Sequence, residues 1–290
     1  MDASLFQNPE IHEFIHRALA EDIGDGDHSS LAAIPAGTRG SAQMIIKEAG
    51  VLAGVELSEL VFRLSDPELK CEILIGDGSP VKPGDIALRV SGSVHSILRT
   101  ERLVLNLAQR LSGIATRTRQ LNELIKGTGC RLLDTRKTTP GLRLLEKWAV
   151  RVGGGENHRI GLYDMIMLKD NHNDYAGGIS AAVNRTALYL KEKGLNLKVE
   201  VETRNLDEVK EALNTGKVDR IMLDNFDVDA LKEAVAFIDH RVETEASGGI
   251  TESTIRAYAE TGVDFISVGA LTHSVKALDI SLKEVHDQER

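Results

Sequence analysis

The chain has 290 residues, of which 42% are hydrophobic, so it can bury a large core in one α/β unit or in two domains. Its 35 Lys and Arg against 44 Asp and Glu give a net charge of -9, which argues against nonspecific binding to nucleic acid or to an anionic membrane. Cys71 and Cys130 lack metal-ligand and Cys-x-x-Cys spacing, which favours two reduced structural thiols over a disulfide framework or a zinc site.

The first part of the chain predicts an α+β domain. Asn8-Pro9 is a good cap and first-turn pair, and apolar residues recur at helical spacing behind it, so a helix is expected over 9–21. This segment has no unbroken apolar run, and no stretch of 18 apolar residues occurs anywhere, so we expect a soluble cytoplasmic protein without a membrane partner. Short β-like segments follow at 42–54, 70–76 and 86–94.

A long helical stretch, 96–126, carries the expected domain boundary. Its Ser112-Gly113 pair predicts a break or kink between two helices. We therefore place an N-terminal α+β sandwich domain at 1–112 and a phosphate-binding α/β barrel domain at 113–290, with the C-terminal tail able to pack back on the first domain.

Beyond the boundary, apolar β runs alternate with helical segments. The six runs are 130–134, 164–168, 197–202, 220–224, 242–247 and 265–269. This repeat indicates a parallel sheet with helices outside it, closed or nearly closed into a barrel. Because fewer than eight strands are clear, we expect an incomplete TIM-like α/β barrel.

Polar residues follow nearly every run, at the rim where such barrels carry their active sites. They are Asp134 to Lys137, Lys169 to His172, Glu200, Glu202, Asp224, Asn225, Ser247 to Gly249 and Ser267 to Gly269. The segments "ASGGIT" (246–251) and "SVGALTHS" (267–274) place glycines before helical segments, where free backbone N–H groups suit a phosphate; plain tight turns are the alternative.

The acids and the cations of the rim suggest different ligands. Glu202 and Asp224 end neighbouring strands and could hold Mg²⁺, directly or through water, or ribose hydroxyls; salt bridges to rim lysines are the alternative. The cations Arg136, Lys137, His158, Arg159 and Lys169 lie around a glycine loop, 153–155, that could approach a ligand closely. Together they imply a polyanionic substrate and phosphoribosyl chemistry, with the acceptor left open.

These motifs carry a family resemblance over nearly the whole chain. They are, in order, "TERLVLNLAQRLSGIAT", "DTRKTTPGLRLLEKWAVRVGGGENHR", "LYDMIMLKDNH", "VEVET", "IMLDNF", "ASGGI" and "SVGALTHS". The sequence resembles quinolinate phosphoribosyltransferase, also called nicotinate-nucleotide pyrophosphorylase (carboxylating). Trp148 and Val152 stand where tyrosine, and cysteine or threonine, are more familiar in that family, and the interval from Glu202 to Asp224 is one residue longer.

The resemblance implies a homodimer in which Arg102 reaches into the partner subunit's site. It implies that the cations bind the two quinolinate carboxylates and the pyrophosphate, that Glu202 and Asp224 lie near the ribose and Mg²⁺, and that the late glycine loops bind the 5′-phosphate. The catalytic residues would be Lys137, Glu202 and Asp224. The substrate-binding residues would be Arg102, Thr135, Arg136, Lys137, His158, Arg159, Lys169, Glu202, Asp224, Ser247, Gly248, Gly249, Gly269, Ala270 and His273.

The implied reaction joins quinolinate to 5-phosphoribosyl 1-pyrophosphate, giving nicotinate mononucleotide, pyrophosphate and CO₂ in de novo NAD biosynthesis. Three alternatives stay open at this point. They are a phosphoribosyltransferase with another acceptor such as nicotinate, a silent barrel that senses a phosphorylated metabolite, and a phosphate-binding isomerase or lyase with Glu202 as its base.

Overall fold

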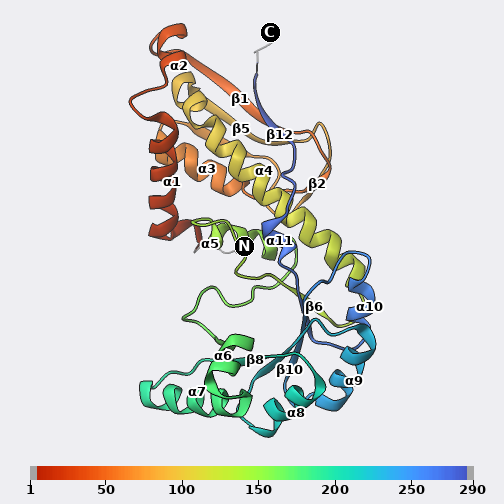
Figure 1. Cartoon of the computed structure of the whole chain (residues 1–290). Coiled ribbons are helices and arrows are strands. Elements are labelled where there is room, and N and C mark those ends of the chain that lie inside the picture. The colour runs from red at the N-terminus through yellow and green to blue at the C-terminus, as the bar shows by residue number, and fades with distance from the viewer. Residues whose placement is uncertain (1–4, 286–290) are drawn as a thin grey trace. The chain divides into compact units, whose positions relative to one another are not determined.

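The computed structural model describes residues 5–285, which form two compact units. Among these residues, the first unit comprises 5–117 and 275–285, and the second comprises Thr118–Ser274 (Figure 1). The division falls inside one long helix, α4 (Val94–Ile125).

The first unit is built on a four-stranded antiparallel sheet in the order β12-β1-β5-β3. Its strands are β1 (Arg39–Ile46), β3 (Lys70–Ile73), β5 (Ile86–Ser93) and β12 (Ile280–Glu284), and a small second sheet pairs β2 (Gly50–Val51) with β4 (Pro80–Val81). Ala42, Met44 and Ile46 of β1 are buried in alternation, as expected for a strand with one face on a core. The C-terminal strand β12 pairs with β1 and so joins the first unit.

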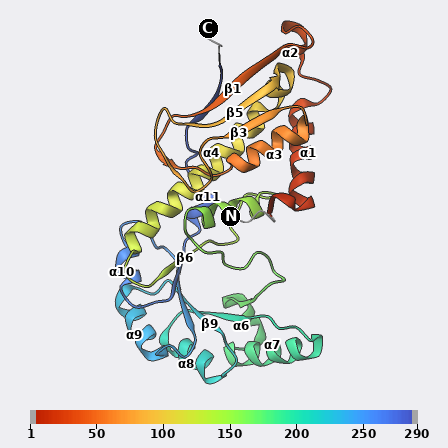
Figure 2. The same cartoon turned by 180° about the vertical axis from the view of Figure 1, so that it is seen from behind.

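Helix α3 (Val55–Ser65) and the first part of α4 lie against this sheet, and α1 (Pro9–Ile23) lies beside α3 (Figure 2). The remaining helices of the first unit are η1 (Leu5–Gln7) and α2 (His28–Ala33). The helix expected at the N-terminus is confirmed as α1, where Asn8 accepts a hydrogen bond from the Glu10 amide and Pro9 fills the first position. Its buried side chains, Ile11, Ile15 and Leu19, recur at helical spacing.

The break expected at Ser112-Gly113 is wrong, because α4 runs through it without interruption. Ser112 Oγ accepts a 2.9 Å hydrogen bond from the Ala53 amide and donates to the Ala53 carbonyl. A Cβ on Gly113 would lie 2.3 Å from the Lys276 carbonyl oxygen. These small residues therefore serve close packing inside the first unit, and the helix accommodates both.

The second unit holds a six-stranded parallel sheet in the order β6-β11-β10-β9-β8-β7. Its strands are β6 (Arg131–Leu133), β7 (Ile166–Leu168), β8 (Val199–Thr203), β9 (Arg220–Asp224), β10 (Glu243–Ser247) and β11 (Phe265–Ser267). Each of the six predicted apolar runs overlaps one of them, and only β8 extends past its run, by one residue. Strand β6, the first of the unit in the sequence, pairs with β11, the last. Because β6 and β7 are both edge strands and do not pair with each other, the sheet is an incomplete barrel, and the predicted fold class is confirmed.

Helices α7 (Ile179–Lys193), α8 (Leu206–Asn214) and α9 (Val228–Ile238) lie along the outer side of this sheet (Figure 1). The other helices of the second unit are α5 (Arg143–Val152), α6 (Asp170–Ala176), α10 (Ile255–Ala259) and α11 (Ala270–His273). Side-chain caps start two of them: Asn205 accepts from the Glu208 amide before α8, and Asp227 accepts from the Ala230 amide before α9. Because all strand pairs of this sheet are parallel, the carboxyl ends of its strands lie at one rim.

Candidate active site

A cavity of about 920 Å³ opens at that rim, and every residue lining it belongs to the second unit. The predicted site residues that line it are Thr135, Arg136, Lys137, His158, Arg159, Lys169, Glu202, Asp224, Ser247, Gly248, Gly249, Gly269, Ala270 and His273. The structure therefore brings together every predicted site residue of the second unit. Arg102 is exposed on α4, in the first unit.

The end of β6 is anchored by a buried charge pair. Asp134, which is fully buried, accepts a hydrogen bond from the Lys147 ammonium of α5 and another, of 2.9 Å, from the His158 amide. The second Asp134 oxygen accepts from the Asn157 side chain. Burial raises the pKa of Asp134 although Lys147 opposes it, and burial lowers the pKa of Lys147 although Asp134 opposes it. This network fixes the segment 157–159 to the strand that carries Thr135 to Lys137.

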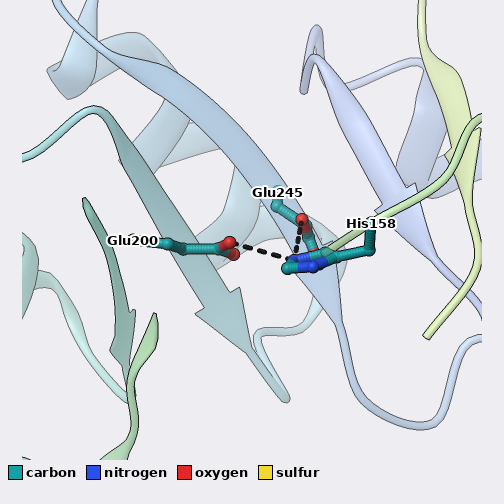
Figure 3. A group of neighbouring side chains, drawn as sticks. All are labelled: His158, Glu200 and Glu245. Atoms are coloured by element: carbon teal, nitrogen blue, oxygen red, sulfur yellow. Dashed lines mark ion pairs between the residues drawn. The ribbon is translucent and has the colours of Figure 1, made fainter. Parts of the chain in front are cut away.

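Beneath the cavity, His158 faces two buried glutamates (Figure 3). Its Nε2 lies 2.9 Å from Glu200 Oε2 on β8 and 3.3 Å from Glu245 Oε2 on β10. Burial by itself would lower the pKa of His158, but the two carboxylates outweigh it and raise that pKa to about 9. The Arg159 amide donates to Nδ1 at 2.7 Å, a hydrogen bond that only the neutral ring can accept, so this contact opposes the rise in pKa. In either form the Nε2 proton faces the glutamates.

His158, Glu200 and Glu245 have ligand atoms within 4.8 Å of one another, the spacing of a metal site. A cation is already present there, because Arg220 Nη1 lies 3.1 Å from Glu245 Oε2 and 4.0 Å from Glu200 Oε2. A metal on Nε2 would also require the ring proton on Nδ1, where the Arg159 amide donates. Arg220 thus already supplies positive charge to both carboxylates, and the cluster is closed by its own side chains.

The cations at the cavity surface have no such balance. Among residues 5–285, Arg136, Lys137 and Arg159 form no ion pair, and the buried Arg136 Nε has no hydrogen-bond partner. Burial lowers the pKa of Arg159, and the neighbouring Arg136 lowers it further. Repulsion between two guanidiniums held side by side is relieved when an anion binds both.

The two predicted acids line the cavity from adjacent strands. Glu202, on β8, is only 9% exposed and lies 3.6 Å from Lys169 Nζ, so a salt bridge to a rim lysine exists. Burial raises the pKa of Glu202, Lys169 opposes this, and Asp224 on β9 raises it further. Asp224 accepts a 2.6 Å hydrogen bond from Asn225. Mg²⁺ prefers carboxylate oxygens as ligands, and a cation would also relieve the repulsion between these two carboxylates. Glu202 and Asp224 therefore fit that ion.

Glycines that follow strands β10 and β11 form another part of the cavity wall. The Gly248 and Gly249 amides, which follow β10, donate to no other described residue, and both glycines have positive φ, 89° and 62°. A Cβ on Gly248 would lie 2.2 Å from Asn225 Oδ1. Next to β11, Thr272 Oγ1 donates to the Lys137 carbonyl at 2.7 Å and so ties this wall to the cationic loop. Free amides in a left-handed turn form a concave site for an anion.

The expectation that the glycine loop 153–155 approaches a ligand is wrong. None of its three glycines lines the cavity. Gly155 instead packs tightly in the second unit, because a Cβ there would lie 2.8 Å from Val150 Cγ1 and 2.9 Å from Thr118 Cγ2.

Sequence reasoning missed several cavity residues. Met167 and Met222 line the cavity from β7 and β9 and provide apolar surface of the kind that packs on a flat ring. Glu245 was missed although it carried a signal: a glutamate in the middle of a strand expected to be buried needs a partner inside the barrel. Arg220, at the start of β9, is that partner together with His158.

Comparison with known families decides the relationship. Residues 114–283 match the family model for the C-terminal domain of quinolinate phosphoribosyl transferase, and residues 27–112 match the model for its N-terminal domain. The chain belongs to the quinolinate phosphoribosyl transferase family. The two matches lie on either side of the boundary expected from the sequence.

Individual members of this family resemble the chain along most of its length. The chloroplastic nicotinate-nucleotide pyrophosphorylase (carboxylating) of Oryza sativa subsp. japonica is 50% identical over 289 residues, covering 94% of this chain and 77% of that protein. A probable nicotinate-nucleotide pyrophosphorylase (carboxylating) of Synechocystis sp. is 43% identical, covering 96% of this chain and 93% of that protein. The crystal structure of NadC from Streptococcus pyogenes superposes with a TM-score of 0.91 at 40% identity, covering 99% and 100% of the two chains.

In the described part of the chain, no helix combines the length and the apolar character needed to span a membrane.

Proposed function

We propose that this chain transfers the phosphoribosyl group of 5-phosphoribosyl 1-pyrophosphate to quinolinate with loss of CO₂, giving nicotinate mononucleotide and pyrophosphate in de novo NAD biosynthesis. The observation that carries the proposal is the set of cations at the cavity surface, Arg136, Lys137 and Arg159, which have no carboxylate partner among the described residues. The names of relatives up to 50% identical support the same reaction.

Quinolinate recognition is assigned to the guanidiniums. Arg136 and Arg159 bind the two adjacent carboxylates, because planar forks match carboxylates and because a dianion relieves their repulsion. Lys169 contributes a further charge, and Met167 and Met222 pack on the pyridine ring. His158 lies below these groups, at the cavity floor.

The second substrate is assigned to the opposite side of the cavity. The amides of Gly248 and Gly249, with Ser247, and those of Gly269 and Ala270 bind the 5′-phosphate. Glu202 and Asp224 accept hydrogen bonds from the ribose hydroxyls. Thr135, Lys137 and His273 face the pyrophosphate, whose negative charge grows as it leaves.

The reaction proceeds in two steps. The pyridine nitrogen attacks C1 of the ribose, a C–N bond forms, and the C1–O bond to pyrophosphate breaks with its electron pair. Lys137 stabilises the leaving group, and the Glu202 and Asp224 carboxylates stabilise the positive charge that develops at the ribose and the ring. The C–CO₂ bond next to the quaternary nitrogen then breaks, its electron pair stays on the ring carbon, and that carbon takes up a proton.

Mg²⁺ is the proposed cofactor. Glu202 and Asp224 would hold it, directly or through water, since they present oxygen donors from adjacent strands. When bound it supplies charge neutralisation for the pyrophosphate.

The assembly and its location are also proposals. A homodimer with Arg102 of one subunit at the other subunit's site would account for a charged side chain that is exposed on α4 and distant in sequence from every cavity residue. The plant relatives are named chloroplastic or mitochondrial, and we propose the cytoplasm for this chain on its composition.

An assay of the purified protein tests the reaction. With Mg²⁺ and 5-phosphoribosyl 1-pyrophosphate, quinolinate should give nucleotide and CO₂, and nicotinate should give neither. Turnover of nicotinate alone would identify another acceptor, and binding without turnover would identify a sensor. Lys137→Ala and Arg159→Ala should each lower kcat/KM for quinolinate by about 100-fold or more, since each leaves a substrate anion without its partner. Near-normal kinetics would remove these assignments.

A further inference from the structure

Asn225, which follows β9, has a left-handed backbone conformation that side chains other than glycine rarely adopt. Its φ is 58°, and among residues 5–285 the other non-glycine residues with positive φ are Asp239 and His240. Asparagine tolerates this conformation better than most residues, because its short polar side chain can form local hydrogen bonds. Asp239 ends α9 away from the cavity, whereas Asn225 lines the cavity. A conformation of this kind persists at a site because surrounding contacts hold it.

The contacts of Asn225 connect two parts of the cavity wall. Its Nδ2 donates a 2.6 Å hydrogen bond to Oδ2 of Asp224. Because a carboxylate accepts hydrogen bonds and donates none, the amide nitrogen faces Asp224 and the amide oxygen faces away from it. That oxygen lies against Gly248, where a Cβ would be 2.2 Å from it. The main-chain amide of Asn225 donates to the Ser247 carbonyl at 2.9 Å. One residue thus joins the end of β9 to the turn that follows β10.

We propose that Asn225 is a positioning residue, which sets the spacing between the Asp224 carboxylate and the glycine turn 248–249 so that the two together fit a ribose 5-phosphate unit. The inference rests on the proposed function, in which Asp224 binds ribose hydroxyls and the turn binds the 5′-phosphate. The hydroxyls and the phosphate belong to one small ligand, whose length fixes the distance between the groups that bind them. A rotation of Asp224 or a shift of the turn would therefore lose one of the two contacts.

Asparagine meets demands here that related residues do not. Among residues 5–285 the Asp224 carboxylate has no other hydrogen-bond partner, and repulsion from Glu202 favours its rotation out of the cavity. Glycine at 225 would adopt the backbone conformation freely but would leave Asp224 without its donor. Aspartate at 225 would tolerate the conformation but would place a second carboxylate against Asp224.

Asn225→Gly separates positioning from stability. Glycine adopts a positive φ without strain, so the urea midpoint of unfolding should stay the same or rise. KM for 5-phosphoribosyl 1-pyrophosphate should nevertheless rise about 10-fold, as expected for one lost hydrogen bond to a charged group, while KM for quinolinate stays unchanged. Asp239→Gly is the matched control, because Asp239 has a φ of 49° and does not line the cavity, and it should change neither KM. An unchanged KM for 5-phosphoribosyl 1-pyrophosphate in Asn225→Gly, or an equal rise in both KM values, would overturn the positioning role.

A second variant tests the donor itself. Asn225→Asp keeps the shape of the side chain and its tolerance of the backbone conformation, but it replaces the N–H donor by an oxygen. It should raise KM for 5-phosphoribosyl 1-pyrophosphate by about 10-fold or more. An unchanged KM would show that Asp224 needs no donor, which contradicts the proposal.

Calorimetry without an acceptor distinguishes this inference from the proposed function. Ribose 5-phosphate carries the hydroxyls and the phosphate, whereas inorganic phosphate can occupy the glycine turn alone. Asn225→Gly should weaken binding of ribose 5-phosphate about 10-fold and leave binding of inorganic phosphate unchanged. Equal weakening of both ligands, or no binding of ribose 5-phosphate to the unmodified protein, would refute the spacing role. Binding of ribose 5-phosphate without quinolinate turnover in the unmodified protein would instead refute the proposed function and leave the comparison of variants valid.

Discussion

Replacing Lys147 by methionine should destabilise the second unit strongly. Lys147 is 1% exposed, and Asp134, its one anionic partner at hydrogen-bond distance among residues 5–285, is fully buried. Methionine fills a similar volume but leaves Asp134 as a buried carboxylate without a cation. Removing one member of a buried ion pair costs about 3–5 kcal/mol in the free energy of unfolding. For a unit of this size that corresponds to a loss of Tm on the order of 10 °C.

The chain provides its own probe for this measurement. Trp148 is its one tryptophan, lies next to Lys147 on α5 and is 5% exposed, so its fluorescence reports unfolding of the second unit. Urea and thermal unfolding are followed for the unmodified protein, for Lys147→Met and for Lys126→Met. Lys126 pairs with Glu123 at the surface, with the two side chains 74% and 58% exposed, so its loss should cost less than about 1 kcal/mol. If the two variants unfolded at the same urea concentration, the buried pair would not anchor β6.

Three further predictions concern other parts of the molecule. Burial raises the pKa of Asp77, which caps α3, to about 6, against an ordinary value of 3.8. Because the folded-state pKa is the higher one, the first unit should lose up to about 3 kcal/mol of stability from this group as the pH rises from 4 to above 6. Asp77→Asn should abolish that loss in urea unfolding followed by circular dichroism. Mixing inactive Arg102→Ala and Lys137→Ala proteins should restore part of the activity if a site takes residues from two subunits, and no recovery would argue against a shared site. Gly248→Ala should raise KM for 5-phosphoribosyl 1-pyrophosphate far more than Gly249→Ala, because a Cβ at 248 meets a side-chain oxygen at 2.2 Å and one at 249 meets nothing within 4 Å; equal effects would remove the shape argument for this wall.

The sequence predicted the second unit well because its signals are local. An apolar run followed by a polar residue marks both a buried strand and the rim at its end, so Glu202 and Asp224 could be placed on adjacent strands before any coordinates. The glycines at 248 and 249 were recognisable for the same reason. What the sequence could not supply was the partner of each buried charge.

Lys147 illustrates that limit. Within α5 it has the pattern of a solvated lysine on an amphipathic helix, and only the return of the chain to β6 places it against Asp134, 13 residues earlier. At Ser112-Gly113 the local signal for a break was present, but the helix continues through it. Ala53 and Lys276, which are distant in sequence, pack against these two small residues. Tertiary contacts override propensity at both sites.

The charges of the site are arranged in two levels with different roles. At the cavity floor, Glu200 and Glu245 face His158 and Arg220, so their charge is compensated inside the protein. At the surface, Arg136 and Arg159 have no anionic partner among residues 5–285, so a ligand must supply both negative charges. An acceptor with one carboxylate would leave one of the two guanidiniums partly desolvated and unpaired. Sites built to pair a polar group reject analogues that lack it by factors of about 10⁴. We therefore expect the two neighbouring arginines to discriminate quinolinate from nicotinate.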